Sequence, residues 1–67
     1  MKVSYDRLWK LLIDKKMNKT QLREAVGMSS STIAKMSKEQ DVAMPILMRI
    51  CETLDCNIED IIEFVED

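Results

Sequence analysis

The sequence of residues 19–38 is KTQLREAVGMSSSTIAKMSK. Two helices are predicted within this stretch, and the other helices are predicted on either side of it. Asn18, just before this stretch, is a favourable helix N-cap. Gln21, three residues later, occupies the capping-box position from which its side-chain amide can accept a hydrogen bond from the Asn18 backbone N–H. A helix is therefore predicted over residues 19–26. Gly27, the only glycine of the chain, suits the left-handed residue that ends such a helix.

A second short helix is predicted after this turn, capped by Ser29 and running through Lys38. Two short helices joined so tightly must cross steeply, as in a helix-turn-helix, and the second one projects outward. At about 100° per residue, Ile33 and Met36 share its inner face. The outer face is small and polar and carries two cations. It comprises Ser30, Ser31, Ala34, Lys35 and Lys38.

Three further helices are predicted, so that residues 1–67 form one all-α domain of five helices. The first covers about residues 5–16 after a cap at Ser4. The fourth has Pro45 in its first turn, where a missing N–H costs nothing. The fifth starts at Asn57. Its apolar residues are Ile58, Ile61, Ile62, Phe64 and Val65. Tyr5 and Trp9 are expected in the core or between the first and fifth helices, and the alternative is an aromatic patch that binds a partner.

Composition excludes several classes of function. No apolar leader or membrane-length apolar run is seen in the sequence, so a cytoplasmic protein is expected. Cys51 and Cys56 lack the C-x-x-C spacing and are expected to be reduced thiols. The sequence contains no His, and its C-terminal carboxylates lie on a short terminal segment where no cleft is evident. We therefore expect no bound metal ion, no cofactor and no enzymatic activity.

Charge is divided unevenly along the chain. Residues 1–38 contain nine Lys and Arg and three Asp and Glu, which gives a net charge of +6. Residues 39–67 contain one Arg and nine Asp and Glu, which gives a net charge of −8. A basic half can face phosphates while an acidic half points away. The overall net charge of −2 is therefore compatible with nucleic-acid binding.

The sequence LREAVGMSSSTIAKM at residues 22–36, followed by MRICETLDC and NIEDII, resembles the Cro/phage-repressor (XRE-type) helix-turn-helix family. The resemblance covers about residues 5–64. It implies a lambda-repressor-like domain that binds double-stranded DNA sequence-specifically, with the helix after Ser29 in the major groove, and acts as a transcriptional regulator.

The resemblance also implies residue roles. Base reading is expected from Ser30, Ser31 and Lys35, and Ala34 offers a methyl group to thymine. The resemblance implies a phosphate contact at Lys19, and the other cations Lys16, Arg23 and Lys38 are expected to make further phosphate contacts. The pattern departs from the family at Arg23, where Ala is usual, and after the helix of residues 29–38, where a frequent Gly is missing.

Too little chain follows Phe64 and Val65 to cover them, so with Ile61 they predict a homodimer interface on the fifth helix. No membrane or small-molecule partner is expected. A helical protein-interaction module, antitoxin-like or adaptor, that does not read DNA remains the alternative, and its association with DNA would be weak and insensitive to salt.

Overall fold

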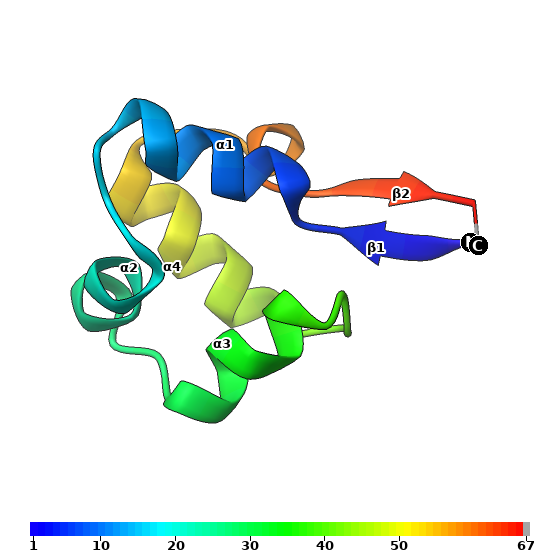
Figure 1. Ribbon diagram of the computed structural model, residues 1–67, viewed down its shortest axis with the longest axis horizontal. Helices are drawn as coiled ribbons and strands as arrows, with labels where there is room; N and C mark the ends of the chain where they lie inside the picture. The colour runs from blue at the N-terminus through cyan, green and yellow to red at the C-terminus, as the bar shows by residue number, and fades with distance from the viewer. Residues whose placement is uncertain (67) are drawn as a thin grey trace.

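The computed structural model describes residues 1–66, which form four α-helices and a two-stranded antiparallel sheet (Figure 1). In chain order the elements are β1 Lys2–Ser4, α1 Asp6–Asp14, α2 Lys19–Val26, α3 Ser30–Ser37, α4 Met44–Leu54, the 3-10 turn η1 Ile58–Asp60 and β2 Glu63–Val65. None of the helices in this described part is long and apolar enough to cross a membrane.

The predicted fifth helix is wrong, and with it the purely α-helical class. Asn57 does begin a turn, and its N–H donates to the Asp60 carboxylate at 3.0 Å, but the turn is a single 3-10 turn. The chain then extends as β2 and pairs with β1, Val3 opposite Phe64. A short isolated helix is marginal, whereas antiparallel pairing satisfies backbone groups at both ends of the chain.

The first helix is shorter than predicted. It begins at Asp6 and ends at Asp14 instead of covering residues 5–16. Ser4 is not the N-cap residue, because it belongs to β1, but its Oγ still accepts a hydrogen bond of 3.3 Å from the Asp6 N–H. Lys16, with φ of 58°, lies in the turn that leads away from the helix.

The helix-turn-helix agrees with the prediction. Asn18 Oδ1 accepts from the Gln21 N–H at 2.7 Å, and the Gln21 side chain accepts from the Asn18 N–H at 2.9 Å. Gly27 adopts φ of 84° and closes α2 with a 2.9 Å bond to the Arg23 carbonyl. Ser29 Oγ accepts from the Thr32 N–H and starts α3, which ends at Ser37, one residue earlier than predicted.

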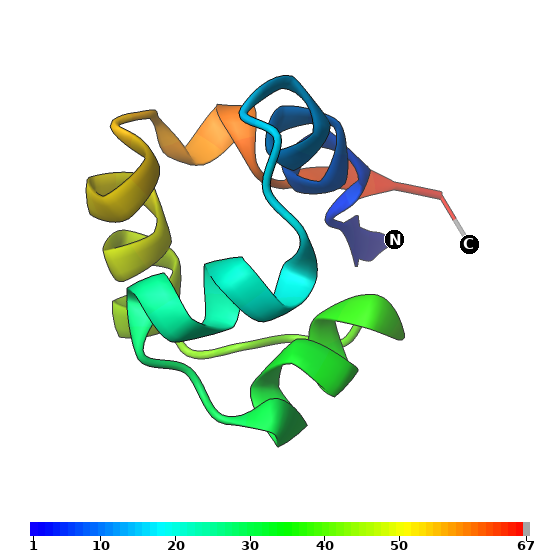
Figure 2. The same ribbon diagram turned by 60° about the vertical axis from the view of Figure 1, so that its left-hand side comes forward.

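One apolar core holds these elements together, with α2 and α3 on one side and α1 and η1 on another (Figure 2). The largest fully buried side chains come from all four α-helices and from the residues that flank α1 and η1. They are Tyr5, Leu8, Leu22, Met36, Ile50 and Ile61. Trp9 is only half-buried, and with no fifth helix beside it, its ring contacts Tyr5 and Lys19. Because Met36 of α3 is part of this core, α3 is fixed in orientation.

Candidate nucleic-acid interface

The outer face of α3 presents the four predicted base-reading residues to solvent. Ser30, Ser31, Ala34 and Lys35 are all exposed. Met36 is completely buried on the opposite face of the helix. The helix lies at the rim of the bundle, at the bottom of Figure 1, so its outer face is free of the other elements. The structure thus brings these four side chains onto one accessible surface.

Hydroxyl groups at the start of α3 orient one another. Ser29 Oγ lies 2.9 Å from Ser31 Oγ and 3.0 Å from Thr32 Oγ1. A hydroxyl group is both donor and acceptor, so Ser31 keeps hydrogen-bonding capacity toward solvent while its position is restrained by the N-cap residue. Restrained short side chains of this kind suit close approach to base edges.

The four predicted phosphate-contacting residues lie on different segments. Lys16 is exposed in the turn between α1 and α2, and Lys38 is the exposed C-cap of α3. Lys19 is the first residue of α2. Arg23, at the position where the family usually has Ala, is half-buried on α2. The helix-turn-helix therefore accommodates Arg23 beside the fully buried Leu22.

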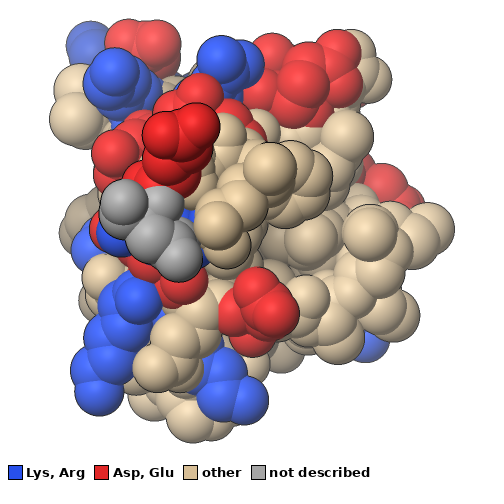
Figure 3. Space-filling view, turned by 90° about the vertical axis from the view of Figure 1, so that its right-hand side faces the viewer, with Lys and Arg blue, Asp and Glu red and all other residues tan. Residues whose placement is uncertain are grey.

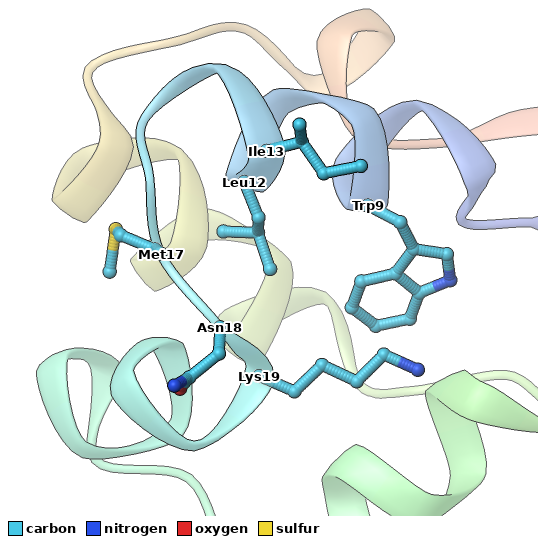
Figure 4. Close-up of a pocket in the computed structure, with 6 residues that line it drawn as sticks. All are labelled: Trp9, Leu12, Ile13, Met17, Asn18 and Lys19. Atoms are coloured by element: carbon cyan, nitrogen blue, oxygen red, sulfur yellow. The ribbon is translucent and has the colours of Figure 1, made fainter.

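Lys19 has two contacts that sequence reasoning missed. Its Nζ lies 4.3 Å from the centroid of the Trp9 ring and donates to Ser37 Oγ at 3.2 Å. Figure 4 shows the Lys19 side chain extended below the Trp9 indole, at the border of an open, mainly apolar hollow of about 300 Å³. The hollow is lined by Trp9, Leu12, Ile13, Met17, Asn18 and Lys19.

Part of the basic half is neutralised by the acidic half. Arg7 Nε lies 3.2 Å from Glu63 Oε2 and its Nη1 donates to the Glu59 carbonyl, while Lys2 Nζ lies 3.6 Å from Glu39 Oε2. Among the described residues, the Lys and Arg of α2 and α3 and Lys38 form no ion pair with a carboxylate. On the face that the strands point toward, Asp and Glu predominate in the upper and central parts, with some Lys and Arg among them at the top, and further Lys and Arg lie toward the lower left (Figure 3).

The connection after α3 is fixed by the N-terminal segment. Glu39 adopts φ of 58°, which is the conformation that the missing Gly would otherwise supply. The Gln40 N–H bonds to the Lys35 carbonyl at 2.9 Å, and the Tyr5 hydroxyl donates to the Gln40 carbonyl at 2.7 Å. A residue that begins the first helix thereby anchors the loop that follows the exposed helix.

A helix-turn-helix whose second helix is exposed, polar and anchored by a buried residue defines a DNA-binding domain. Residues 7–67 match the Cro/C1-type HTH DNA-binding domain family, and the chain belongs to that family. Among the residues described, no group of His, Cys, Asp and Glu suited to hold a metal ion is found.

Two relatives carry regulator names. The chain is 53% identical to the transcriptional regulator VanUg, and its structure superposes on the VanUg crystal structure with a TM-score of 0.96. The superposed region covers 98% of this chain and 88% of the VanUg chain. The chain is also 36% identical over 59 residues to the uncharacterized HTH-type transcriptional regulator YozG of Bacillus subtilis (strain 168). This alignment covers 85% of this chain and 70% of YozG.

The anchoring of the loop by Tyr5 has a pH-dependent consequence. Burial raises the pKa of the Tyr5 phenol and the nearby Asp41 carboxylate raises it further, while a hydrogen bond with the Val42 backbone lowers it. A phenol whose pKa is raised by folding stabilises the fold below its ordinary pKa of about 10, and this contribution is lost as the pH rises through the folded value.

Tyr5→Phe should therefore lower the free energy of unfolding by about 0.5 to 1.5 kcal/mol at pH 7, because it removes the hydrogen bond to the Gln40 carbonyl. It should also flatten the decline in stability above pH 10. Urea unfolding of wild type and variant between pH 7 and 11 measures the unfolding free energy of each. Any effect of lysine deprotonation is shared by the two proteins, so their difference reports on Tyr5. Parallel declines of wild type and variant above pH 10 would contradict this role of Tyr5.

Proposed function

We propose that this protein is a transcriptional regulator that recognises a specific double-stranded DNA sequence with α3 in the major groove. The observation that carries the proposal is the exposed face of α3, which is small and polar and opposes the fully buried Met36. The B-DNA major groove is about 12 Å wide and admits an α-helix. Small side chains allow the helix backbone to approach the bases closely.

Within this proposal each outward residue has a chemical role. Lys35 donates to the O6 and N7 acceptors of guanine, Ser30 and Ser31 donate or accept at base edges, and the Ala34 methyl group packs against a thymine methyl group. Such contacts carry the sequence information. The exposure of all four side chains supports this assignment.

The surrounding cations position the duplex without reading it. We assign phosphate contacts to Lys16, Lys19, Arg23 and Lys38. In the described part of the chain, the Lys and Arg of α2 and α3 and Lys38 form no ion pair with a carboxylate, which supports this role. Each phosphate neutralised releases counterions, so log K falls with log salt by about 0.9 per contact.

The two kinds of contact are separated by Lys35→Ala and Lys38→Ala. The first should cost about 1 to 3 kcal/mol at particular base pairs and relax sequence preference there. The second should weaken binding to all duplexes alike and lower the salt slope by about 0.9. Binding-site selection from random duplexes, followed by titrations at several salt concentrations, measures both effects, and Lys10→Ala on α1 is the control.

Two outcomes would count against the proposal. If Lys35→Ala leaves the selected consensus and the affinity unchanged, α3 does not read the groove. If wild-type affinity does not depend on salt, the helical protein-interaction module, antitoxin-like or adaptor, is the better description.

We further propose a cytoplasmic homodimer. The helix first expected to form the interface is absent, and Ile61 is fully buried and is excluded from it. Phe64 is 69% exposed on β2 next to the half-buried Val65, and a two-fold interface uses the same patch on both subunits. The pairing of Glu63 with Arg7 reduces acidic repulsion at this patch.

Phe64→Ser should weaken this dimer by at least about tenfold, because each Phe buried contributes more than about 1.5 kcal/mol. Ile13→Ser is the matched control, since Ile13 is 73% exposed but lies on α1. Sedimentation equilibrium from about 1 to 100 μM, the range in which modest dimers dissociate, measures the dimer dissociation constants. A wild type that stays monomeric throughout, with cooperative DNA binding intact in Phe64→Ser, would remove β2 as the interface.

A further inference from the structure

The ammonium group of Lys19 is held in one place by two elements other than its own helix. Its Nζ lies 4.3 Å from the centroid of the Trp9 ring on α1 and 3.2 Å from Ser37 Oγ at the end of α3. Lys19 is the first residue of α2. One side chain therefore connects three helices at the border of the proposed DNA-binding surface (Figure 4).

Electrostatics explains this direction of the side chain. The N-terminus of a helix carries positive partial charge and repels a cation, whereas the C-terminal end of a helix attracts one. Lys19 at the start of α2 extends instead toward Ser37, the last residue of α3. The face of an indole ring is also negative and attracts an ammonium group.

The held ammonium group keeps capacity for another partner. An ammonium has three N–H donors, and Ser37 Oγ takes one of them. Lys19 is exposed to solvent, and so is Lys38, the residue next to Ser37. A free lysine side chain samples many rotamers, and fixing it before binding reduces the entropy that is lost in the contact it later makes.

We propose that Trp9 is a positioning residue for DNA binding, which with Ser37 pre-organises the Lys19 ammonium group to meet a phosphate of the duplex. The inference rests on the proposed function, because it requires Lys19 to contact the DNA backbone. Trp9 itself touches no nucleotide in this account. Its effect on DNA affinity passes entirely through Lys19.

A purely structural role for the same contact makes a different prediction. If Trp9 and Lys19 only hold α1 against α2 and α3, removing either residue changes the unfolding free energy, and their effects on DNA affinity are independent. If Trp9 positions Lys19 for a phosphate, the two effects on DNA affinity are coupled, and replacing Trp9 no longer lowers the affinity once the Lys19 ammonium group is gone.

The test is a double-mutant cycle of Trp9→Leu and Lys19→Met, measured as the affinity for a duplex selected by the wild type. Lys19→Met keeps the apolar stem and should lower the salt slope by about 0.9. Trp9→Leu should weaken binding by about two- to fivefold, which corresponds to an exposed cation–π contact. The double variant should bind no more weakly than Lys19→Met alone.

Trp9→Leu combined with Lys38→Met is the control cycle and should be additive, because Lys38 is exposed and the described Trp9 ring contact is with Lys19 and not with Lys38. Trp9→Phe keeps a smaller aromatic face, so it should recover part of the loss, and it replaces Trp9→Leu in the cycle if the latter does not fold. Urea unfolding of each variant separates effects on stability from effects on binding.

The outcomes distinguish the inference from the function on which it rests. A lowered salt slope in Lys19→Met with additive effects in the Trp9–Lys19 cycle overturns the positioning role and leaves the Lys19 phosphate contact standing. Coupling seen only in the unfolding free energy also overturns it. An unchanged salt slope in Lys19→Met removes the phosphate contact itself, while the variants at Lys35 and Lys38 still judge whether α3 lies in the groove.

Discussion

The left-handed backbone at Gly27 is the constraint on which the arrangement of α2 and α3 depends. With φ of 84°, Gly27 ends α2, and both its N–H and that of Met28 bond to the Arg23 carbonyl. A Cβ added at Gly27 would meet no atom within 4 Å, so glycine is required by the backbone angle and not by space. Ser29 then starts α3 in a new direction.

The exposed surface follows from that change of direction and from the burial of one residue. Met36 enters the core, so the opposite face of α3 is turned outward with Lys35 near its last turn. The Tyr5 hydroxyl fixes the loop beyond α3 through Gln40. The proposed base-reading surface is thus supported at both ends, by the N-cap before the helix and by a buried tyrosine after it.

Local signals predicted α2, its glycine end and the start of α3, because a cap and a left-handed residue act within a few positions of the chain. The same kind of signal at Asn57 predicted a helix wrongly. Pairing of β2 with Lys2–Ser4 joins residues about 60 positions apart, and no local pattern contains that partner. The β-branched and aromatic residues Val3, Phe64 and Val65 at the two chain ends were the available indication.

The candidate site was predictable where it depends on helical periodicity and less so where it depends on distant contacts. Periodicity predicted that Ser30, Ser31, Ala34 and Lys35 lie on one face, and all four are exposed. Charge segregation along the chain did not reveal that Arg7 is paired with Glu63. Nor did it reveal the contact of Lys19 with Trp9, because it depends on how α1 and α2 pack.

The insertion of α3 into the major groove is tested most directly by intermolecular nuclear Overhauser effects in a complex with a selected duplex. The account predicts contacts between the exposed Ala34 methyl group and major-groove protons, such as thymine methyl or cytosine H5 protons. If Ala34 shows no contact with DNA while α4 or β2 contacts base protons, α3 is not the reading helix and the account is contradicted.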